Sequence, residues 1–228
     1  MIECKNLTFY YGEKAVLQNF SLTLPDRGVV CLFGPSGCGK TTLFRLLAGL
    51  ETPAGGTISG LSDKKVGVLF QEDRLLGHLT ARQNIALVLS ERHSDLPDRI
   101  LAQMKLEQEK EQYPEHLSGG MRRRVAIGRA LAYHGDILLM DEPFQGLDRE
   151  LKQLIINSVL EQYKDRLIVM ITHDAAEAVR MADTVYQVKG TPLELVKKFS
   201  FSVPPYQRDV ALLFEYQKNF SESSQKIV

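Results

Sequence analysis

Nine consecutive residues in the first fifth of the chain have the types and spacing needed to hold a phosphate group. They fit the pattern G-x-x-x-x-G-K-T and read Gly34-Pro35-Ser36-Gly37-Cys38-Gly39-Lys40-Thr41-Thr42. The glycines allow the backbone to curl so that successive N–H groups point toward phosphate oxygens, and Lys40 adds a positive charge for the same oxygens. The Thr41 hydroxyl is an oxygen ligand of the kind that Mg²⁺ prefers. The run therefore predicts a site for the β- and γ-phosphates of a nucleotide together with Mg²⁺.

The residues on either side of this loop support the same interpretation. Residues 29–33 form a short apolar run that predicts a buried parallel strand, and residues 42–49 have helical periodicity and end at a glycine. Strand, loop and helix in this order place phosphates at a helix N-terminus. The alternative is a chance glycine-rich turn, which the flanking strand and helix disfavour.

Acidic residues follow a second apolar run. Residues 137–140 predict another buried strand, and Asp141 and Glu142 come directly after it. Asp141 can hold Mg²⁺, directly or through water, and Glu142 can polarise an attacking water molecule. An ordinary strand that ends in acidic turn residues is the alternative, and the phosphate loop upstream makes it the weaker one.

Two further strands are predicted to end in residues that suit a ligand site. The strand over 66–70 ends at Gln71 and the strand over 167–171 leads to His173, and ligands bind at the carboxyl ends of parallel strands. Taken alone, Gln71 is better read as a surface glutamine. A lone histidine is usually structural, but the position of His173 at the end of a strand in such a sheet predicts that it faces a γ-phosphate. Tyr10 and Tyr11 precede a turn, where an aromatic ring can stack on adenine, although a cross-strand pair is the preferred reading of the residues alone.

Residues 72 to about 134 predict a helical insertion between two strands of one sheet. Helices are expected over 80–90, 97–108 and 118–133, with Ser118 as the N-cap of the last and Gly119 and Gly120 leaving its N-terminus open to close approach. A solvated basic face is the interpretation for most of the four arginines on this helix, which are Arg122, Arg123, Arg124 and Arg129.

The remaining segments complete an α/β fold with a mainly parallel sheet around a phosphate-loop core. Antiparallel strands are expected over 2–9 and 16–24, joined by a turn at 12–14, and a turn-rich connection over 51–57. A helix over 175–181 and a closing strand over 184–188 follow. Beyond residue 190 prolines break the pattern, a short helix is expected over 210–216 and the tail over 221–226 is expected to fray. One domain results: core and β subdomain over 1–71 and 135–190, helical subdomain over 72–134, and extension over 191–228.

Composition limits the function classes. The chain has 228 residues, of which 28 are Lys or Arg and 28 are Asp or Glu, so its net charge is zero and gives no electrostatic footprint for nucleic acid. Its three cysteines lack metal or disulfide spacing, which favours a reduced cytosolic setting. The N-terminus does not resemble a signal peptide, and the apolar runs fall short of the ~20 residues that span a bilayer. Any work at a membrane is therefore expected to need a partner that spans it.

The whole set of motifs resembles the ATP-binding-cassette (ABC) ATPases, the motor subunits of ABC transporters. The resemblance covers residues 1–190 and rests on the phosphate loop, Gln71, the sequence Leu-Ser-Gly-Gly at residues 117–120, Asp141-Glu142 and His173, in that order. The Leu-Ser-Gly-Gly sequence, here called the signature motif, is highly specific because most other phosphate-loop ATPases lack it.

The resemblance implies a role for each matching residue. Residues 34–42 are the Walker A loop that binds ATP, and Tyr11 stacks on the adenine. Asp141 and Glu142 are the Walker B pair, with Glu142 as catalytic base. Gln71 touches Mg²⁺ and the attacking water, His173 is the switch histidine on the γ-phosphate, and Gly146-Leu147-Asp148 is the end of the D-loop at the nucleotide.

The resemblance also implies partners. Ser118, Gly119 and Gly120 of one subunit cap the ATP held by the other, in a head-to-tail homodimer. The dimer sits on a transmembrane permease at the cytoplasmic face of the membrane, and an extracytoplasmic binding protein delivers the solute. A soluble ABC ATPase of DNA repair or translation, or an exporter motor, is the alternative.

Finer similarity suggests a branch of the family. Residues 70–76 with Leu79-Thr80 are similar to the nitrate, sulfonate and taurine group of bacterial importers. The sequence departs from that pattern at Gln145 in the D-loop, at Gly77-His78 in the region expected to meet the permease, and at Arg123, where glutamine is frequent. None of these positions has a predicted phosphate, water or metal role, so an active ATPase is expected.

Overall fold

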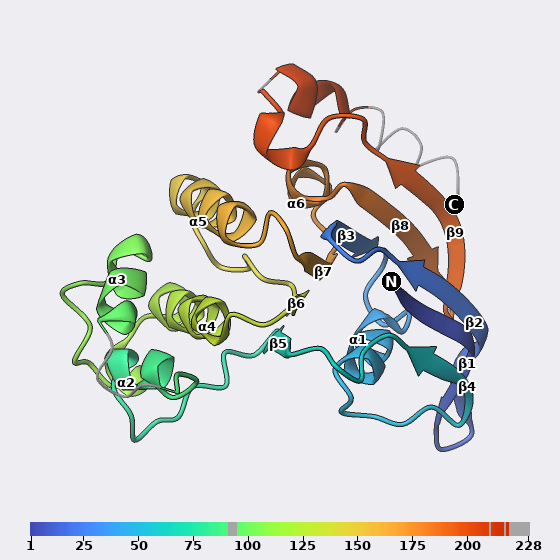
Figure 1. Ribbon diagram of the computed structural model, residues 1–228, viewed down its shortest axis with the longest axis horizontal. Coiled ribbons are helices and arrows are strands. Elements are labelled where there is room, and N and C mark those ends of the chain that lie inside the picture. Colours follow the sequence, from blue (N-terminus) through green and yellow to red (C-terminus); the bar gives the residue numbers. More distant parts are fainter. Residues whose placement is uncertain (91–94, 210, 217, 219–228) are drawn as a thin grey trace. The chain divides into compact units, whose positions relative to one another are not determined.

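A computed structural model describes the chain except for residues 91–94, 210, 217 and 219–228 (Figure 1). It separates into two compact units. The first unit combines Met1–Lys64 with Tyr163–Val228, and the second is Lys65–Gln162. The helical segment predicted over 72–134 lies inside the second unit, which also contains two strands and a further helix.

An antiparallel sheet forms one part of the first unit. Strand β1 (Ile2–Tyr11) lies between β2 (Lys14–Leu24) and β4 (Gly55–Ser59), so the strands predicted over 2–9 and 16–24 are confirmed. The prediction of turns over 51–57 was wrong in part, because β4 begins there. Glycine disfavours strands, but Gly56 has φ +84° and a Cβ at that position would collide with β1 backbone carbonyls. The close approach of the two backbones therefore requires glycine at position 56. Because glycine is unusual in strands, this same residue is the reason why the sequence pattern did not predict β4.

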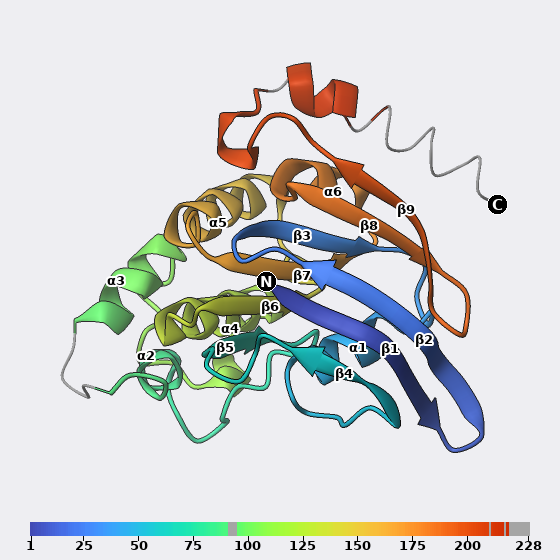
Figure 2. The same cartoon turned by 45° about the vertical axis from the view of Figure 1, so that its right-hand side comes forward.

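A mainly parallel set of strands forms the other part of the first unit. Strand β3 (Gly28–Phe33) pairs in parallel with β7 (Leu167–Thr172) on one side and β8 (Thr184–Lys189) on the other, as Figure 2 shows. Every residue of β7 is buried, as its continuous apolar sequence predicts. The antiparallel strand β9 (Glu194–Ser200) pairs with β8, so the prediction that 184–188 closes the sheet was wrong. No residue of β9 is fully buried, so it lacks the alternation that marks a half-buried strand.

Two helices of the first unit follow strand ends. Helix α1 (Lys40–Leu47) begins after the phosphate loop, and α6 (Ala175–Met181) has the predicted bounds. Residues 211–216 are helical, in agreement with the helix expected over 210–216, whose first residue lies outside the described part. The tail predicted to fray over 221–226 also lies outside it.

The second unit joins two parallel strands to a group of helices. Strand β5 (Val66–Leu69) pairs with β6 (Ile137–Asp141). Helices α2 (Ala81–Ala86), α3 (Leu96–Gln103) and α4 (Gly119–Tyr133) pack together (Figure 1), followed by α5 (Arg149–Gln162). Helices α2 and α3 are shorter than the predicted 80–90 and 97–108. The packing is close: a Cβ on Gly128 of α4 would lie 2.8 Å from Cγ2 of Ile100 on α3.

Across the described residues we find no helix with both the length and the apolar character needed to cross a membrane.

Candidate nucleotide-binding site

The phosphate loop connects β3 to α1, as predicted. Its last residue before the helix, Gly39, has φ 107° and ψ 3°, and no side chain caps the helix. The first N–H groups of an α-helix lack intrahelical partners and carry the positive end of the helix dipole. The N-terminus of α1 is therefore suited to an anion.

Lys40 is folded over this loop. Its side chain is buried, and Nζ donates hydrogen bonds to the carbonyls of Gly34 at 2.8 Å and Pro35 at 2.7 Å. A buried ammonium group is stable only when its charge is compensated. These carbonyls hold the cation at the loop, where a phosphate group would supply stronger compensation.

Glycine is required at specific points of the loop. Gly37 has φ +79° and Gly39 φ +107°, both unfavourable for L side chains. A Cβ on Gly39 would also lie 3.0 Å from Cγ1 of Val16 on β2, whereas one on Gly37 would meet nothing within 4 Å. The strand β2 thus packs directly against the end of the loop.

His173 lies at the same edge of the first unit as the loop. Strand β3 pairs with β7 as far as Phe33 and Thr172, so the loop and His173 leave neighbouring strand ends. The Thr172 hydroxyl donates to Oε2 of Glu177 at 2.8 Å, and Oδ1 of Asp174 accepts from the N–H of Ala176 at 2.8 Å. His173 is therefore held between an anchored strand end and a capped helix start.

Tyr11 ends β1 and leaves 47% of its surface exposed. Its neighbour across the strands is Lys14, and its ring instead meets the edge of Phe9 on its own strand, with centroids 5.0 Å apart. The preferred alternative of a cross-strand pair on the sheet surface agrees with the register, which pairs Tyr11 with Lys14 and Tyr10 with Ala15. An exposed, supported ring fits stacking on a base.

In the second unit, the predicted strand-end residues come together. Strands β5 and β6 pair in parallel, with Leu69 opposite Met140. Gln71 comes two residues after Leu69, and Glu142 comes two residues after Met140, so both lie at the same edge of this strand pair. Glu142 has φ 45°, in the left-handed region. That conformation costs a non-glycine residue on the order of 1–3 kcal/mol and persists only where surroundings enforce it.

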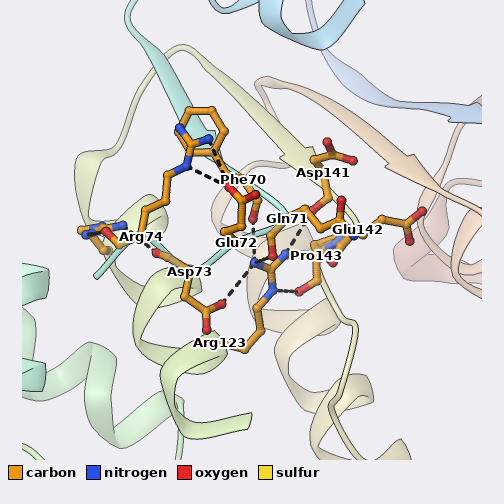
Figure 3. Close-up of polar contacts among 10 residues, drawn as sticks. Phe70, Gln71, Glu72, Asp73, Arg74, Arg123, Asp141, Glu142 and Pro143 are labelled. Carbon is orange, nitrogen blue, oxygen red and sulfur yellow. Dashed lines mark hydrogen bonds and ion pairs between the residues drawn. The ribbon is translucent and has the colours of Figure 1, made fainter. Parts of the chain in front are cut away.

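Arg123 of α4 stabilises the backbone at Glu142 in this way (Figure 3). Its side chain is only 4% exposed and reaches both strand ends. Its guanidinium donates to five backbone carbonyls: Pro143 at 2.8 Å, Phe70 at 2.6 Å, Gln71 at 3.0 Å, Asp141 at 3.0 Å and Glu142 at 2.8 Å. Burial lowers the pKa of the Arg123 guanidinium, and the negative charges of Asp73, Asp141 and Glu142 oppose that shift.

The prediction of a solvated basic face was wrong for this helix. Arg122 donates to the Leu117 carbonyl at 2.7 Å, and Arg124 donates to the Met104 carbonyl at 2.7 Å. Arg129 bonds to the segment that follows Gln71. A signal was available: three consecutive helical positions point about 100° apart, so residues 122–124 cannot share one solvent face.

The signature motif begins α4, and Ser118 is its N-cap as predicted. The Ser118 hydroxyl accepts from the Met121 N–H at 3.2 Å. A Cβ on Gly120 would lie 3.5 Å from the Gly146 carbonyl oxygen, so the motif lies next to the D-loop. In that loop, Asp148 accepts from the Leu151 N–H at 2.9 Å and thereby caps α5, a structural role that the sequence did not reveal.

The candidate metal-binding residues offer suitable donors. Thr41 contributes a hydroxyl oxygen in the first unit, and Gln71 and Asp141 contribute amide and carboxylate oxygens in the second. Hard oxygen donors of this kind are what Mg²⁺ prefers, and Mg²⁺ commonly takes one or two protein ligands with phosphates and waters. Within the described residues no group of three or more His, Cys, Asp or Glu side chains is arranged to hold a metal ion.

Comparison with known proteins identifies the family. The family described as "ABC transporter" matches residues 17–145, more than half of the chain. The chain therefore belongs to the ABC transporter family.

Two relatives carry names that are more specific than the family description. The chain is 36% identical to the "Sulfate/thiosulfate import ATP-binding protein CysA" of Vibrio vulnificus (strain CMCP6), over 86% of this chain and 65% of that protein. It is 32% identical to the "Fe(3+) ions import ATP-binding protein FbpC" of Escherichia coli O157:H7, over 97% of this chain and 70% of that protein. The chain thus spans slightly less than two thirds of the length of the CysA relative. Both relatives carry names of import proteins, and neither name refers to nitrate, sulfonate or taurine.

A solved structure has the same fold. It is described as "Dimeric structure of a post-hydrolysis state of the ATP-binding cassette MJ0796 bound to ADP and Pi" and superimposes with a TM-score of 0.77 at 28% identity, over 88% of this chain and 98% of that one. The predicted fold class, an α/β ABC cassette with a mainly parallel sheet and an antiparallel β subdomain, is confirmed.

Proposed function

We propose that this chain is the ATP-hydrolysing motor subunit of an ABC importer. The observation that carries the proposal is the buried Lys40 ammonium held over a glycine loop at the uncapped N-terminus of α1. That arrangement presents a cation and backbone N–H donors to one anion. The family supports a nucleoside triphosphate as that anion.

The proposed chemistry assigns one task to each group. Lys40 and the loop N–H groups stabilise negative charge on the transferred phosphoryl group, and Tyr11 stacks on the base. Glu142 accepts the proton of the attacking water, and His173 and Gln71 orient the γ-phosphate and that water. Thr41, Gln71 and Asp141 would hold Mg²⁺, which neutralises phosphate charge when bound.

The names of the relatives, which describe import ATP-binding proteins, support membrane partners. A separate transmembrane permease would receive the cassette on its cytoplasmic face, and an extracytoplasmic binding protein would supply the solute. Two copies of the chain would hold ATP between the loop of one and Ser118, Gly119 and Gly120 of the other. The names of the relatives favour sulfate, thiosulfate or iron(III) as cargo over the nitrate, sulfonate or taurine suggested by residues 70–76.

The catalytic part is tested by ATP turnover of the purified chain and of Glu142→Gln and Lys40→Ala variants. Glu142→Gln is expected to bind a fluorescent ATP analogue normally and to lose hydrolysis about 100-fold or more, since it keeps the shape but not the base. Lys40→Ala is expected to lose binding as well. Turnover by Glu142→Gln equal to that of the unmodified chain would remove Glu142 from the base role.

The transport part is tested by a mild-detergent pull-down with this chain as bait. Recovery of a multi-span membrane protein is expected. Recovery of soluble or nucleic-acid-bound partners alone would redirect the proposal to a soluble ABC ATPase and leave the ATP chemistry unaffected.

A further inference from the structure

Two backbone segments with different proposed tasks lie side by side in the second unit. Residues 70–74 follow β5 and contain Gln71, and residues 141–145 start at the last residue of β6 and contain Glu142. Beyond Leu69 and Met140 the strand pairing ends, so ladder hydrogen bonds no longer fix one segment to the other. Something else must hold the two segments in register if Gln71 and Glu142 are to act on the same water.

The Arg123 guanidinium spans this gap, as Figure 3 shows. Nη1 donates to the carbonyls of Phe70 and Gln71, and Nη2 donates to those of Asp141 and Glu142. The group is rigid and planar, so the two nitrogens cannot move independently. A displacement of one segment is therefore passed to the other through a single side chain.

The contact with Glu142 has a further consequence. The Glu142 carbonyl accepts from Nη2 of Arg123 at 2.8 Å and also from the Gln145 N–H at 3.4 Å, which closes the turn after the strand. With φ 45°, Glu142 needs outside support to keep this backbone conformation. Arg123 supplies that support from the helix that begins with the signature motif.

We propose that Arg123 is a positioning residue that fixes the carboxylate of Glu142 relative to Gln71 by holding the carbonyls at the ends of β5 and β6. The proposal rests on the catalytic roles proposed above for these two residues. Arg123 itself touches neither substrate nor water in this role, because its donors are engaged with the backbone carbonyls and with the Asp73 carboxylate, which accepts from Nη1 at 3.4 Å. Lysine keeps the charge but has a single nitrogen, so Arg123→Lys cannot reproduce the fork.

Arg129 provides a matched control on the same helix. Its guanidinium also donates to backbone carbonyls, those of Asp73 at 3.0 Å and Arg74 at 2.9 Å, and burial lowers the pKa of this arginine too. These carbonyls belong to the first segment and not to the one that holds Glu142. Arg129→Lys thus removes a comparable clamp without releasing the strand end of β6.

The test compares Arg123→Lys, Arg123→Met and Arg129→Lys in ATP turnover of the full chain. We expect both Arg123 variants to lose kcat about ten- to a hundredfold, with KM within about threefold, because misplacement of the base affects the chemical step and not nucleotide capture. Arg129→Lys is expected to keep kcat within about twofold. Equal kcat losses for Arg123→Lys and Arg129→Lys, or a loss confined to KM, would overturn the proposal.

Hydrogen exchange followed by mass spectrometry gives a readout that does not depend on activity. In the absence of nucleotide, Arg123→Lys is expected to speed amide exchange in peptides covering 70–74 and 141–147 together, including the Gln145 amide. Arg129→Lys is expected to speed exchange near 73–76 alone. Unchanged exchange over 141–147 in Arg123→Lys would contradict the proposal even if Arg123→Met fails to fold.

The two levels of inference are separable in this design. If the unmodified chain hydrolyses no ATP, or Glu142→Gln is as active as the unmodified chain, the proposed function fails. The exchange data then still report whether Arg123 links the two segments. If Glu142→Gln is inactive and Arg123→Lys is fully active, only the positioning role fails.

Discussion

At the scale of single residues, the site depends on backbone conformations that most side chains avoid. Gly37 and Gly39 have positive φ in the phosphate loop, and Glu142 has positive φ at the end of β6. In the loop, glycine has no Cβ and therefore avoids the steric cost of positive φ. Glu142 has a Cβ and incurs that cost, and the hydrogen bond from Arg123 to its carbonyl stabilises the conformation. The phosphate loop and the end of β6 thus reach unusual backbone conformations by different means.

The loop glycines lead to a graded prediction. Gly39→Ala is expected to weaken binding of a fluorescent ATP analogue at least about tenfold, since φ 107° lies outside the left-handed basin and the new Cβ would press on Val16. Gly37→Ala should cost less, because its φ of +79° is closer to that basin and its surroundings are open. Titration of both variants checks the order. A larger loss for Gly37→Ala would show that packing against β2 does not shape the loop.

The residue scale also shows what a sequence can reveal about such a site. The phosphate loop, Asp141, Glu142 and His173 were predictable because fixed spacings and apolar strands place them at strand ends. The burial of Arg123 was missed because its partners are carbonyls 18 to 53 residues away, and hydrogen bonds to the backbone leave no trace in side-chain types. The sequence pattern also did not establish the cargo. Residues 70–76 suggested the nitrate, sulfonate and taurine branch of importers, whereas the relatives are named for other solutes.

At the scale of elements, the C-terminal extension is tied to the helix that follows His173. Arg208 is buried and donates to the carbonyls of Val179 and of Ala182, the latter at 2.8 Å, at the end of α6. Cations stabilise the C-terminal end of a helix, where carbonyls lack intrahelical partners. Strand β9 and this arginine escaped prediction for related reasons. An exposed strand such as β9 lacks the alternation of apolar and polar residues that predicts a strand. Arg208 lies outside α6 in the sequence, so the pattern of that helix does not reveal its cap.

This cap leads to a stability prediction. Arg208→Ala is expected to destabilise the protein by about 2–4 kcal/mol, because several buried carbonyls lose their donor. For a chain of this length that corresponds to a fall of about 4–16 °C in Tm. The neighbouring Tyr206→Ala, which removes a side chain that is 67% exposed, should leave Tm nearly unchanged. Calorimetry distinguishes the two, and equal Tm values for both variants would show that the cap contributes little.

At the scale of the whole molecule, the motifs are divided between the two units. The phosphate loop and His173 belong to the first, and the signature motif, Gln71 and Glu142 belong to the second. A single chain carries one copy of each motif, and the proposed arrangement uses the loop of one copy with the signature motif of another. The MJ0796 cassette, which resembles this chain over most of its length, is described as dimeric.

The last prediction tests that arrangement. With Mg²⁺ and ATP, the Glu142→Gln variant is expected to elute as a dimer of twice the 25.7 kDa chain mass in size-exclusion chromatography with light scattering, because nucleotide that is not hydrolysed keeps linking the two copies. Removal of ATP should return it to the monomer, since the nucleotide itself forms part of the contact.

Adding Lys40→Ala to this variant should abolish the dimer by removing nucleotide binding. Replacing Gly120 by a bulky residue should abolish the dimer while each subunit still binds the fluorescent ATP analogue, because the side chain would occupy the space at the signature motif that the partner's nucleotide needs. A dimer that persists in the Gly120 variant would show that the copies associate through another surface.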